Sequence, residues 1–184
     1  MPMDAHKDAE QRSLTDRIGN RLYAVPGIAQ WWAKRSAKKT GQVADVTGDI
    51  PFTRMDRPLR DARVALVTTG GIHLRSQPPY DMVNPDGDAS FREIPAEVLL
   101  DELVITHKYY DHTDADRDPN VIFPLEHLRN LVRDGVLGSV SPRHFGFMGH
   151  IDGPKVAELV QRGAPEVAGK LKQDGVDCVL LTPA

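Results

Sequence analysis

The chain has 184 residues, a mass of 20.4 kDa, 40% hydrophobic and 27% charged residues, and a net charge of −3. This composition is that of a folded globular protein, and the negative charge argues against a general nucleic-acid binder. The N-terminus is too polar for a secretory signal, and no apolar run approaches the roughly 20 residues of a membrane helix. A single cysteine, Cys178, fits a reducing cytoplasm. We therefore expect a cytoplasmic protein with no nucleic-acid or membrane partner.

Residues 1–62 are expected to form an N-terminal arm of helical and extended chain. Helical stretches are predicted around residues 14–23 and 28–37, and Pro51 and Pro58 favour extended chain after them. From Arg63 onward, short apolar runs alternate with helical patterns. That alternation is typical of an α/β domain with a mainly parallel sheet and flanking helices, which we place at residues 63–184.

The elements of this domain follow from its apolar periodicity and its turn residues. Strands are predicted at residues 63–69, 91–94, 103–106, 136–141 and 176–181. Residues 72–90 and 107–120 are predicted to be loops. Helices are predicted at residues 96–102, 124–135 and 152–173, the last interrupted near Gly163 and Pro165.

The last predicted strand, residues 176–181, is a continuous apolar run typical of a buried parallel strand. In open α/β sheets, ligands and catalytic groups gather beyond the carboxyl ends of such strands. A loop and a covering helix are expected after this strand. We therefore expect the sequence to be the front part of an enzyme that continues past Ala184.

Gly70 and Gly71 directly follow the first predicted strand. Paired glycines let backbone N–H groups approach an anion or a carboxylate closely, and His73 adds a proton donor. The spacing is neither that of a dinucleotide-binding motif nor that of a P-loop. An ordinary tight turn with a surface histidine is the alternative.

His107, Asp111 and His112 follow the third predicted strand, at residues 103–106. Such a set could ligate a transition metal, supply general acid and base groups, or form a solvated acidic loop. The residues lack a helical i, i+4 ligand spacing. We therefore predict that this loop lines a pocket and holds no metal.

His144 and Gly149 lie in a third candidate loop, predicted to follow a strand and to precede a helix capped by Asp152. The glycines there permit close backbone approach. The neighbouring Phe145, Phe147 and Met148 would form either an apolar wall over a small substrate or a hydrophobic plug.

These three loops should meet at one rim, because the carboxyl ends of parallel strands share one edge of the sheet. The rim offers histidines and glycine backbone but no activated nucleophile. Cys178 lies within a strand, where a buried structural thiol is expected instead of a reactive one. The missing group should therefore come next in sequence or from a partner.

Five motifs, in order, resemble the selenoprotein B subunits of the glycine/sarcosine/betaine/D-proline reductase family. They are Ala65–His73 (ALVTTGGIH), Ser90–Pro95 (SFREIP), Asp118–Pro124 (DPNVIFP), Phe147–Gly149 (FMG) and Asp177–Pro183 (DCVLLTP). The resemblance covers roughly residues 50–184 and implies an oxidoreductase that cleaves the C–N bond of a small amine or imino acid.

The same resemblance implies that selenocysteine, or cysteine in some relatives, follows the stretch that matches residues 180–184. A UGA codon read as a stop would then truncate the chain, leaving it inactive alone. The cofactor would be a pyruvoyl group on a partner subunit, holding the amine as a Schiff base, with a thiol or selenoprotein as electron donor. In this setting His73, His107 and His144 are candidates for proton transfer, and Gly70, Gly71, Asp111 and Gly149 for substrate contacts.

Two other classes remain open from the sequence. One is a non-catalytic module that binds a small carboxylate. The other is a metal-dependent hydrolase built on His107, Asp111 and His112.

Overall fold

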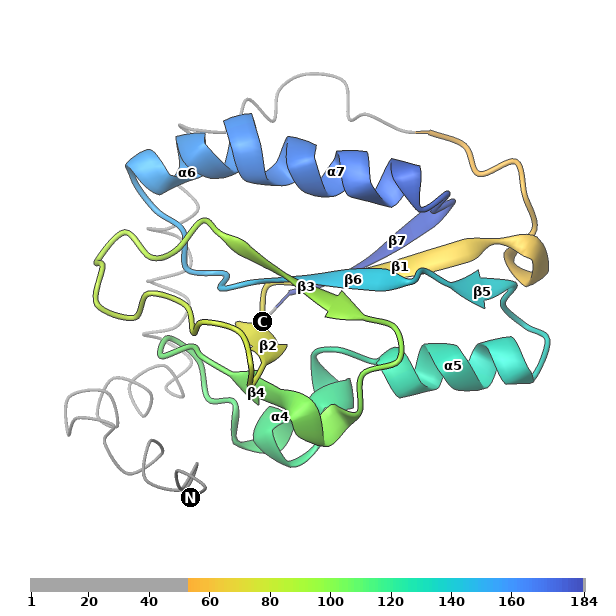
Figure 1. Ribbon diagram of the computed structural model, residues 1–184, viewed down its shortest axis with the longest axis horizontal. Helices are drawn as coiled ribbons and strands as arrows, with labels where there is room; N and C mark the ends of the chain where they lie inside the picture. Colours follow the sequence, from red (N-terminus) through yellow and green to blue (C-terminus); the bar gives the residue numbers. More distant parts are fainter. Residues whose placement is uncertain (1–52, 184) are drawn as a thin grey trace, which may run out of the picture. The chain divides into compact units, whose positions relative to one another are not determined.

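The computed structural model describes residues 53–183 (Figure 1). The helices predicted at residues 14–23 and 28–37 lie outside the described residues. Contacts divide the chain into two units, and the larger one comprises residues 52–107 and 112–184. All the elements named below belong to this larger unit.

The main sheet is built around β1 (Arg63–Thr68), which has parallel neighbours on both sides. One side pairs with β5 (Ser139–Val140) and β6 (Arg143–Phe147), and the other with β7 (Cys178–Thr182). An antiparallel strand, β3 (Phe91–Pro95), adds to β6. The prediction of an α/β fold with a mainly parallel sheet is therefore confirmed for the described residues.

A second, two-stranded sheet corrects the predicted topology. β2 (Ile72–Leu74) pairs antiparallel with β4 (Leu103–Ile105). Residues 103–106 were predicted as a strand of the main sheet, and residues 72–90 as a loop throughout. The chain instead turns back at Gly71. β2 and β4 then pair with each other and not with a strand of the main sheet.

Two helical layers cover opposite faces of the main sheet (Figure 1). α5 (Leu125–Arg133) lies on one face, together with the shorter α4 (Thr113–Arg117). On the other face, α6 (Pro154–Glu158) continues through a π-helical turn, Leu159–Gly163, into α7 (Ala164–Gln173). Short 3-10 turns lie at Leu59–Asp61, Leu100–Glu102 and Pro119–Val121.

The predicted interruption near Gly163 and Pro165 takes the form of this π-helical turn. Proline has no N–H to donate, and its ring clashes with the carbonyl one turn earlier in an α-helix. The wider π turn ends at Gly163, just before Pro165, so the helix continues without a break.

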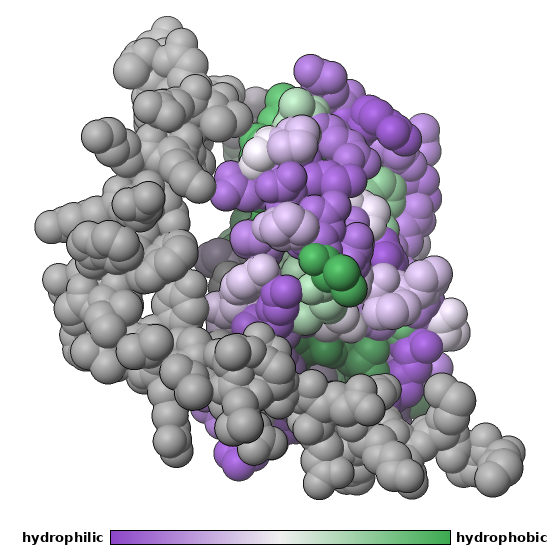
Figure 2. Space-filling view, turned by 90° about the vertical axis from the view of Figure 1, so that its left-hand side faces the viewer, coloured by the Kyte–Doolittle hydropathy of each residue, from purple (hydrophilic) through white to green (hydrophobic). Residues whose placement is uncertain are grey.

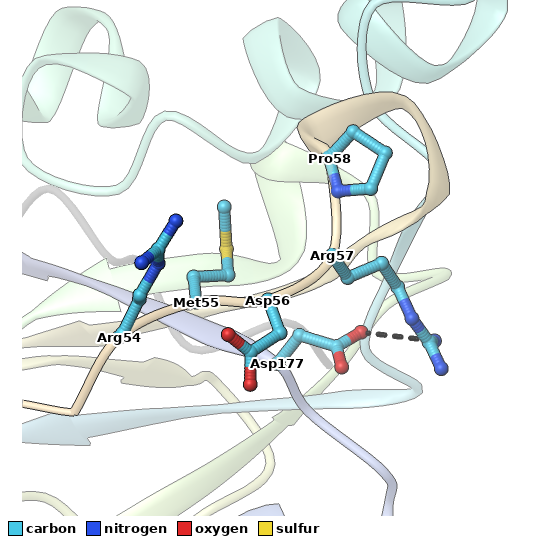
Figure 3. A pocket seen from close by; sticks show the side chains of 6 residues that line it. All are labelled: Arg54, Met55, Asp56, Arg57, Pro58 and Asp177. Carbon is cyan, nitrogen blue, oxygen red and sulfur yellow. Dashed lines mark hydrogen bonds and ion pairs between the residues drawn. The ribbon is translucent and has the colours of Figure 1, made fainter.

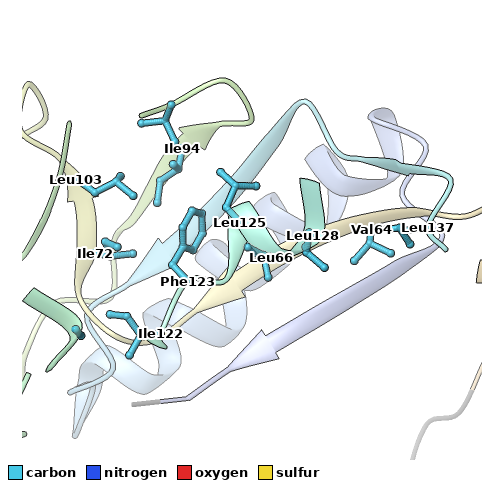
Figure 4. Close-up of a cluster of buried hydrophobic side chains, with 12 residues drawn as sticks. Val64, Leu66, Ile72, Ile94, Leu103, Ile122, Phe123, Leu125, Leu128 and Leu137 are labelled. Atoms are coloured by element: carbon cyan, nitrogen blue, oxygen red, sulfur yellow. The ribbon is translucent and has the colours of Figure 1, made fainter. Parts of the chain in front are cut away.

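β1 supplies one hydrophobic core on each face of the sheet. Val64 and Leu66 point into the larger core, where Phe123 and Leu125 are fully buried (Figure 4). Ala65 points to the opposite core, beneath α7. This alternation is the period of two expected of a strand covered on both faces.

Gly169 on α7 gives a simple test of these helical assignments. A Cβ added there would meet no atom within 4 Å. Gly169→Ala should therefore raise the free energy of unfolding by about 0.5–1 kcal/mol, because alanine restricts the unfolded chain and favours helix. Urea denaturation checks this, and a loss of stability would contradict the α7 assignment.

The prediction of a buried last strand is wrong for the described residues. β7 pairs with β1 alone, and Leu180 and Leu181 are 41% and 69% exposed. In Figure 2 the coloured part of the surface is mainly hydrophilic, with apolar side chains in small patches. Over residues 53–183, no helix is long and apolar enough to cross a membrane.

Candidate functional site

Four strand ends meet around the loop that follows β1. Thr69 N–H donates to Thr182 O at the end of β7, at 3.1 Å, and Gly71 N–H donates to Phe147 O at the end of β6, at 2.8 Å. Gly71 O accepts from Thr106 N–H, beyond β4, at 2.9 Å. These bonds bring the segments after β1, β4, β6 and β7 together, although β4 belongs to the second sheet and not to the parallel sheet from which their convergence was predicted.

Two glycines allow the chains to cross this closely. Gly71 has φ +71°, and a Cβ there would lie 2.6 Å from Thr106 O. Gly149 has φ +89°, and a Cβ there would overlap Thr69 O. Both positions combine a left-handed backbone with direct contact against another chain segment, so each requires glycine.

The N–H groups of Gly70 and Gly71 are engaged inside the protein. Gly70 N–H donates to Thr68 Oγ1 at 3.1 Å, and Gly71 N–H to Phe147 O. An anion bound by these two amides, as predicted, would have to displace those bonds. The structure thus gives the paired glycines a packing role, and their substrate contact remains a prediction.

Thr182, at the end of β7, is hydrogen-bonded to the end of β1 and to Ile122. Its carbonyl accepts from Thr69 N–H and from Thr68 Oγ1, the latter at 3.1 Å. Its own hydroxyl donates to Ile122 O at 2.7 Å. Sequence reasoning missed this residue. The available signal was a threonine at the end of each of two strands that pair in register, Thr68 with Thr182.

His73 lies within β2 and is buried, not in a surface loop as the alternative interpretation held. Its Nδ1 lies 2.8 Å from Leu74 O, and its Nε2 lies 2.7 Å from the Thr106 hydroxyl. The ring also packs edge-on against Tyr80. Burial lowers the pKa of His73, so the neutral ring, with both nitrogens engaged, joins β2 to the end of β4.

His144 corrects the prediction that residues 144–150 follow a strand. Residues 143–147 are themselves β6, and His144 is fully buried in it. Its Nδ1 accepts from Leu66 N–H at 2.9 Å, so the imidazole replaces a backbone acceptor between β6 and β1. Among the described residues, its Nε2 has no hydrogen-bond partner. Burial, and then the charge of Arg129, lower the pKa of His144 to about 4.

Among the three candidate histidines, His107 lies against Gly71, in the loop that follows β1. It follows β4 as predicted and is buried, and its Cβ would be 3.0 Å from a Cβ on Gly71. Burial, followed by the charges of His112 and His150, lowers the pKa of His107 to about 4. His107 is therefore a neutral imidazole at neutral pH, able to accept a proton. Its part in proton transfer remains a prediction.

The proposed metal ligands do not assemble. His112 precedes α4, with Nδ1 2.8 Å from Asp116 Oδ2 and Nε2 3.2 Å from His107 O. Asp111 is exposed. Over the described part of the chain, no three His, Cys, Asp or Glu side chains are grouped closely enough to hold a metal ion.

The apolar residues of the third loop form a plug. Phe145, Phe147 and Met148 are all buried, and the two phenylalanines pack around Phe91. Cys178 is half-buried and packs against the larger core, as expected of a structural thiol. None of these side chains forms the wall of an open substrate cavity.

Two shallow surface grooves in the described part lie away from this rim. One runs along α5 between Glu126, Arg129, Asn130 and Arg133. The other lies between residues 54–58 and Asp177, where Arg57 forms an ion pair of 3.3 Å with Asp177 (Figure 3). Neither groove contains a residue predicted to act in catalysis.

The two most strongly shifted histidines predict acid sensitivity. The pKa values of His107 and His144 fall from 6.5 to about 4 on folding, so the unfolded chain binds more protons between those pH values. The free energy of unfolding should therefore fall as pH drops from about 6.5 to 4, by roughly 3 kcal/mol per histidine. Urea denaturation across this range measures the slope.

His144→Asn is the matched variant for this measurement. The asparagine amide oxygen can take the place of Nδ1 and accept from Leu66 N–H, but it does not titrate. The variant should lose about half of the histidine-dependent slope. A pH dependence identical to that of the parent protein would contradict a buried, neutral His144.

Comparison with known proteins gives consistent matches. A family model for glycine/sarcosine/betaine reductase selenoprotein B matches residues 39–184. The D-proline reductase subunit gamma of Acetoanaerobium sticklandii is 35% identical over 137 residues, covering 74% of this chain and 54% of that protein. The betaine reductase complex component B subunit beta of Peptoclostridium acidaminophilum is 36% identical over 151 residues, covering 73% of this chain and 32% of that protein.

A third relative is named for glycine. The glycine reductase complex component B subunit gamma of Symbiobacterium thermophilum is 31% identical, covering 74% of this chain and 33% of that protein. The chain thus spans about half or one third of the length of these curated relatives. No solved structure matches it.

Proposed function

Because the chain belongs to the glycine/sarcosine/betaine reductase selenoprotein B family, we propose that it forms part of a reductase subunit that cleaves the C–N bond of a small amine or imino acid. The relatives are named for glycine, betaine and D-proline, which share an α-carbon bearing both nitrogen and a carboxylate. That shared chemistry defines the proposed substrate class.

The proposed reaction belongs to the full-length protein, since the matched relatives are about two to three times longer than the region they share with this chain. A selenolate or thiolate following Ala184 would form a bond to the α-carbon while the C–N bond breaks, and the bonding electrons would leave with nitrogen. A dithiol or selenol donor would then supply two electrons to release the reduced acid. A pyruvoyl group on a partner subunit would activate the amine.

The attachment of Thr182 to the rim carries this proposal. The position following Ala184 is three residues beyond Thr182, so it can lie no more than about 11 Å from it. Thr182 itself is hydrogen-bonded to Thr68, Thr69 and Ile122. A reacting group at that position would therefore stay near the meeting point of the strand ends, where α/β enzymes place their chemistry.

The residues of this chain would then provide the surroundings of the reaction. His107, neutral and beside Gly71, is the proposed proton acceptor. His73 and His144 remain candidates for proton transfer. In the structure both ring nitrogens of His73 are hydrogen-bonded, and the buried His144 accepts a hydrogen bond from Leu66 N–H. Gly70, Gly71, Asp111 and Gly149 remain candidates for contact with the substrate carboxylate.

Sequencing the DNA past the codon for Ala184 tests the proposal first. An in-frame UGA followed by a continuing reading frame is expected. The full-length product, supplied with a pyruvoyl-containing partner and a dithiol, should release amine from glycine, sarcosine or betaine, or open the ring of D-proline to a linear amino acid. The 184-residue chain alone should do neither. A different stop codon, or equal activity of both chains, would reject the proposal.

A further inference from the structure

One edge of β7 is open in the described part of the protein. All five of its residues pair with β1, and no other described strand lies beside it. Figure 1 shows β7 crossing beneath α7. An unpaired strand edge presents a row of backbone donors and acceptors that can template another strand.

Two apolar residues of β7, Leu180 and Leu181, are exposed, one on each face of the strand. Leu180 pairs in register with Leu66, whose side chain enters the larger core. Leu181 pairs with Val67, which packs on the opposite core. Leu180 and Leu181 therefore point to opposite faces of the sheet, yet they are 41% and 69% exposed.

This pattern conflicts with a permanent edge position. Native edge strands are usually protected by charged residues, prolines, bulges or short length. The five residues of β7, Cys-Val-Leu-Leu-Thr, include no charge and no proline. Continuous apolar sequence is instead typical of strands buried on both faces of a parallel sheet.

We propose that β7 is an inner strand of the full-length protein, and that a further strand of the same polypeptide pairs with its open edge. The relatives supply the reason to choose this occupant, since the matched regions cover only 54%, 32% and 33% of their lengths. The added strand would carry apolar residues toward both faces and would cover Leu180 and Leu181. This inference concerns strand pairing and does not require the proposed chemistry.

The backbone geometry of β7 identifies which amides report on this pairing. Thr182 O accepts from Thr69 N–H, so the backbone N–H and C=O groups of Thr182 face β1. Because these groups alternate sides along a strand, Leu180 also directs its N–H toward β1, whereas Val179 and Leu181 direct theirs toward the open edge. The outward pair tests the proposal, and Leu180 is an internal control in the same strand.

Amide hydrogen exchange compares the 184-residue chain with the full-length protein carrying cysteine at the proposed nucleophile position. The amides of Val179 and Leu181 should exchange at least about 100-fold more slowly in the full-length protein, since a second ladder would protect them. Leu180 should be protected in both proteins. Leu181→Lys in the full-length protein should reverse the gain at Val179.

Three outcomes would overturn the inference. Equal exchange of Val179 and Leu181 in both proteins would mean that β7 stays an edge. Protection that rises with concentration of the 184-residue chain, together with a dimer in sedimentation, would make a second copy the occupant. Protection of the full-length protein only after addition of its partner subunit would assign the edge to that subunit. None of these readouts depends on reductase activity.

Discussion

Gly71→Ala should lower the free energy of unfolding by about 2–5 kcal/mol. The left-handed backbone at φ +71° costs an L-residue about 1–2 kcal/mol. The added Cβ would also meet Thr106 O at 2.6 Å, and overpacking typically adds about 1–3 kcal/mol. Urea denaturation measures the loss.

Gly135→Ala is the matched control for this substitution. Gly135 has the same φ of +71°, but a Cβ there would meet nothing within 4 Å. It should therefore show only the backbone cost, about 1–2 kcal/mol. Equal losses in the two variants would mean that the strand ends do not cross closely at Gly71, and the geometry of the rim would be wrong.

Thr182→Val in the full-length enzyme should lower kcat by about 100-fold, because displacement of a reacting group by about 1 Å can cost that much. The valine keeps the shape of the side chain but leaves Ile122 O without the hydroxyl that donates to it. The end of β7 would then be free to shift relative to Thr68 and Thr69. Steady-state kinetics measure kcat and KM separately.

Thr182→Ser controls for the hydroxyl itself. It keeps the donor to Ile122 O and should retain kcat within a few fold of the parent enzyme. A positioning role predicts a fall in kcat that exceeds any change in KM. If Thr182→Val lost stability in urea but kept kcat, Thr182 would be a structural residue only.

The elements that could be predicted from sequence are those whose pattern is local. β1 is a β-branched apolar run closed by Gly70, and α5 has its apolar stripe with Gly135 after its end. β3 was located correctly, although its antiparallel pairing with β6 could not be seen. Pairing partners depend on distant residues, so periodicity gives strand positions but not strand neighbours.

β6 was missed for a physical reason. Its sequence, Arg-His-Phe-Gly-Phe, combines a glycine and a histidine that usually signal a loop. Gly146 is required there because a Cβ would overlap Ile72 O, and His144 substitutes for a backbone acceptor. Tertiary packing determines both residues, so no local pattern could indicate a strand.

The location of the candidate site could be predicted from the sequence, but most of its hydrogen bonds could not. Strand-end reasoning predicted that the segments around Gly71, Thr106 and Gly149 would meet. It could not predict that the amides of Gly70 and Gly71 are used internally. Nor could it identify Thr182, whose role depends on a register that only the folded sheet provides.

The central claim is that β7 delivers a reacting chalcogen to this rim, and replacing that single atom tests it most directly. The full-length protein with selenocysteine or cysteine after Ala184 should release amine from its substrate, in the presence of the pyruvoyl-containing partner and a dithiol. The same protein with serine at that position should fold with an unchanged urea midpoint and release no amine. Amine release that survives the change to serine would contradict the account.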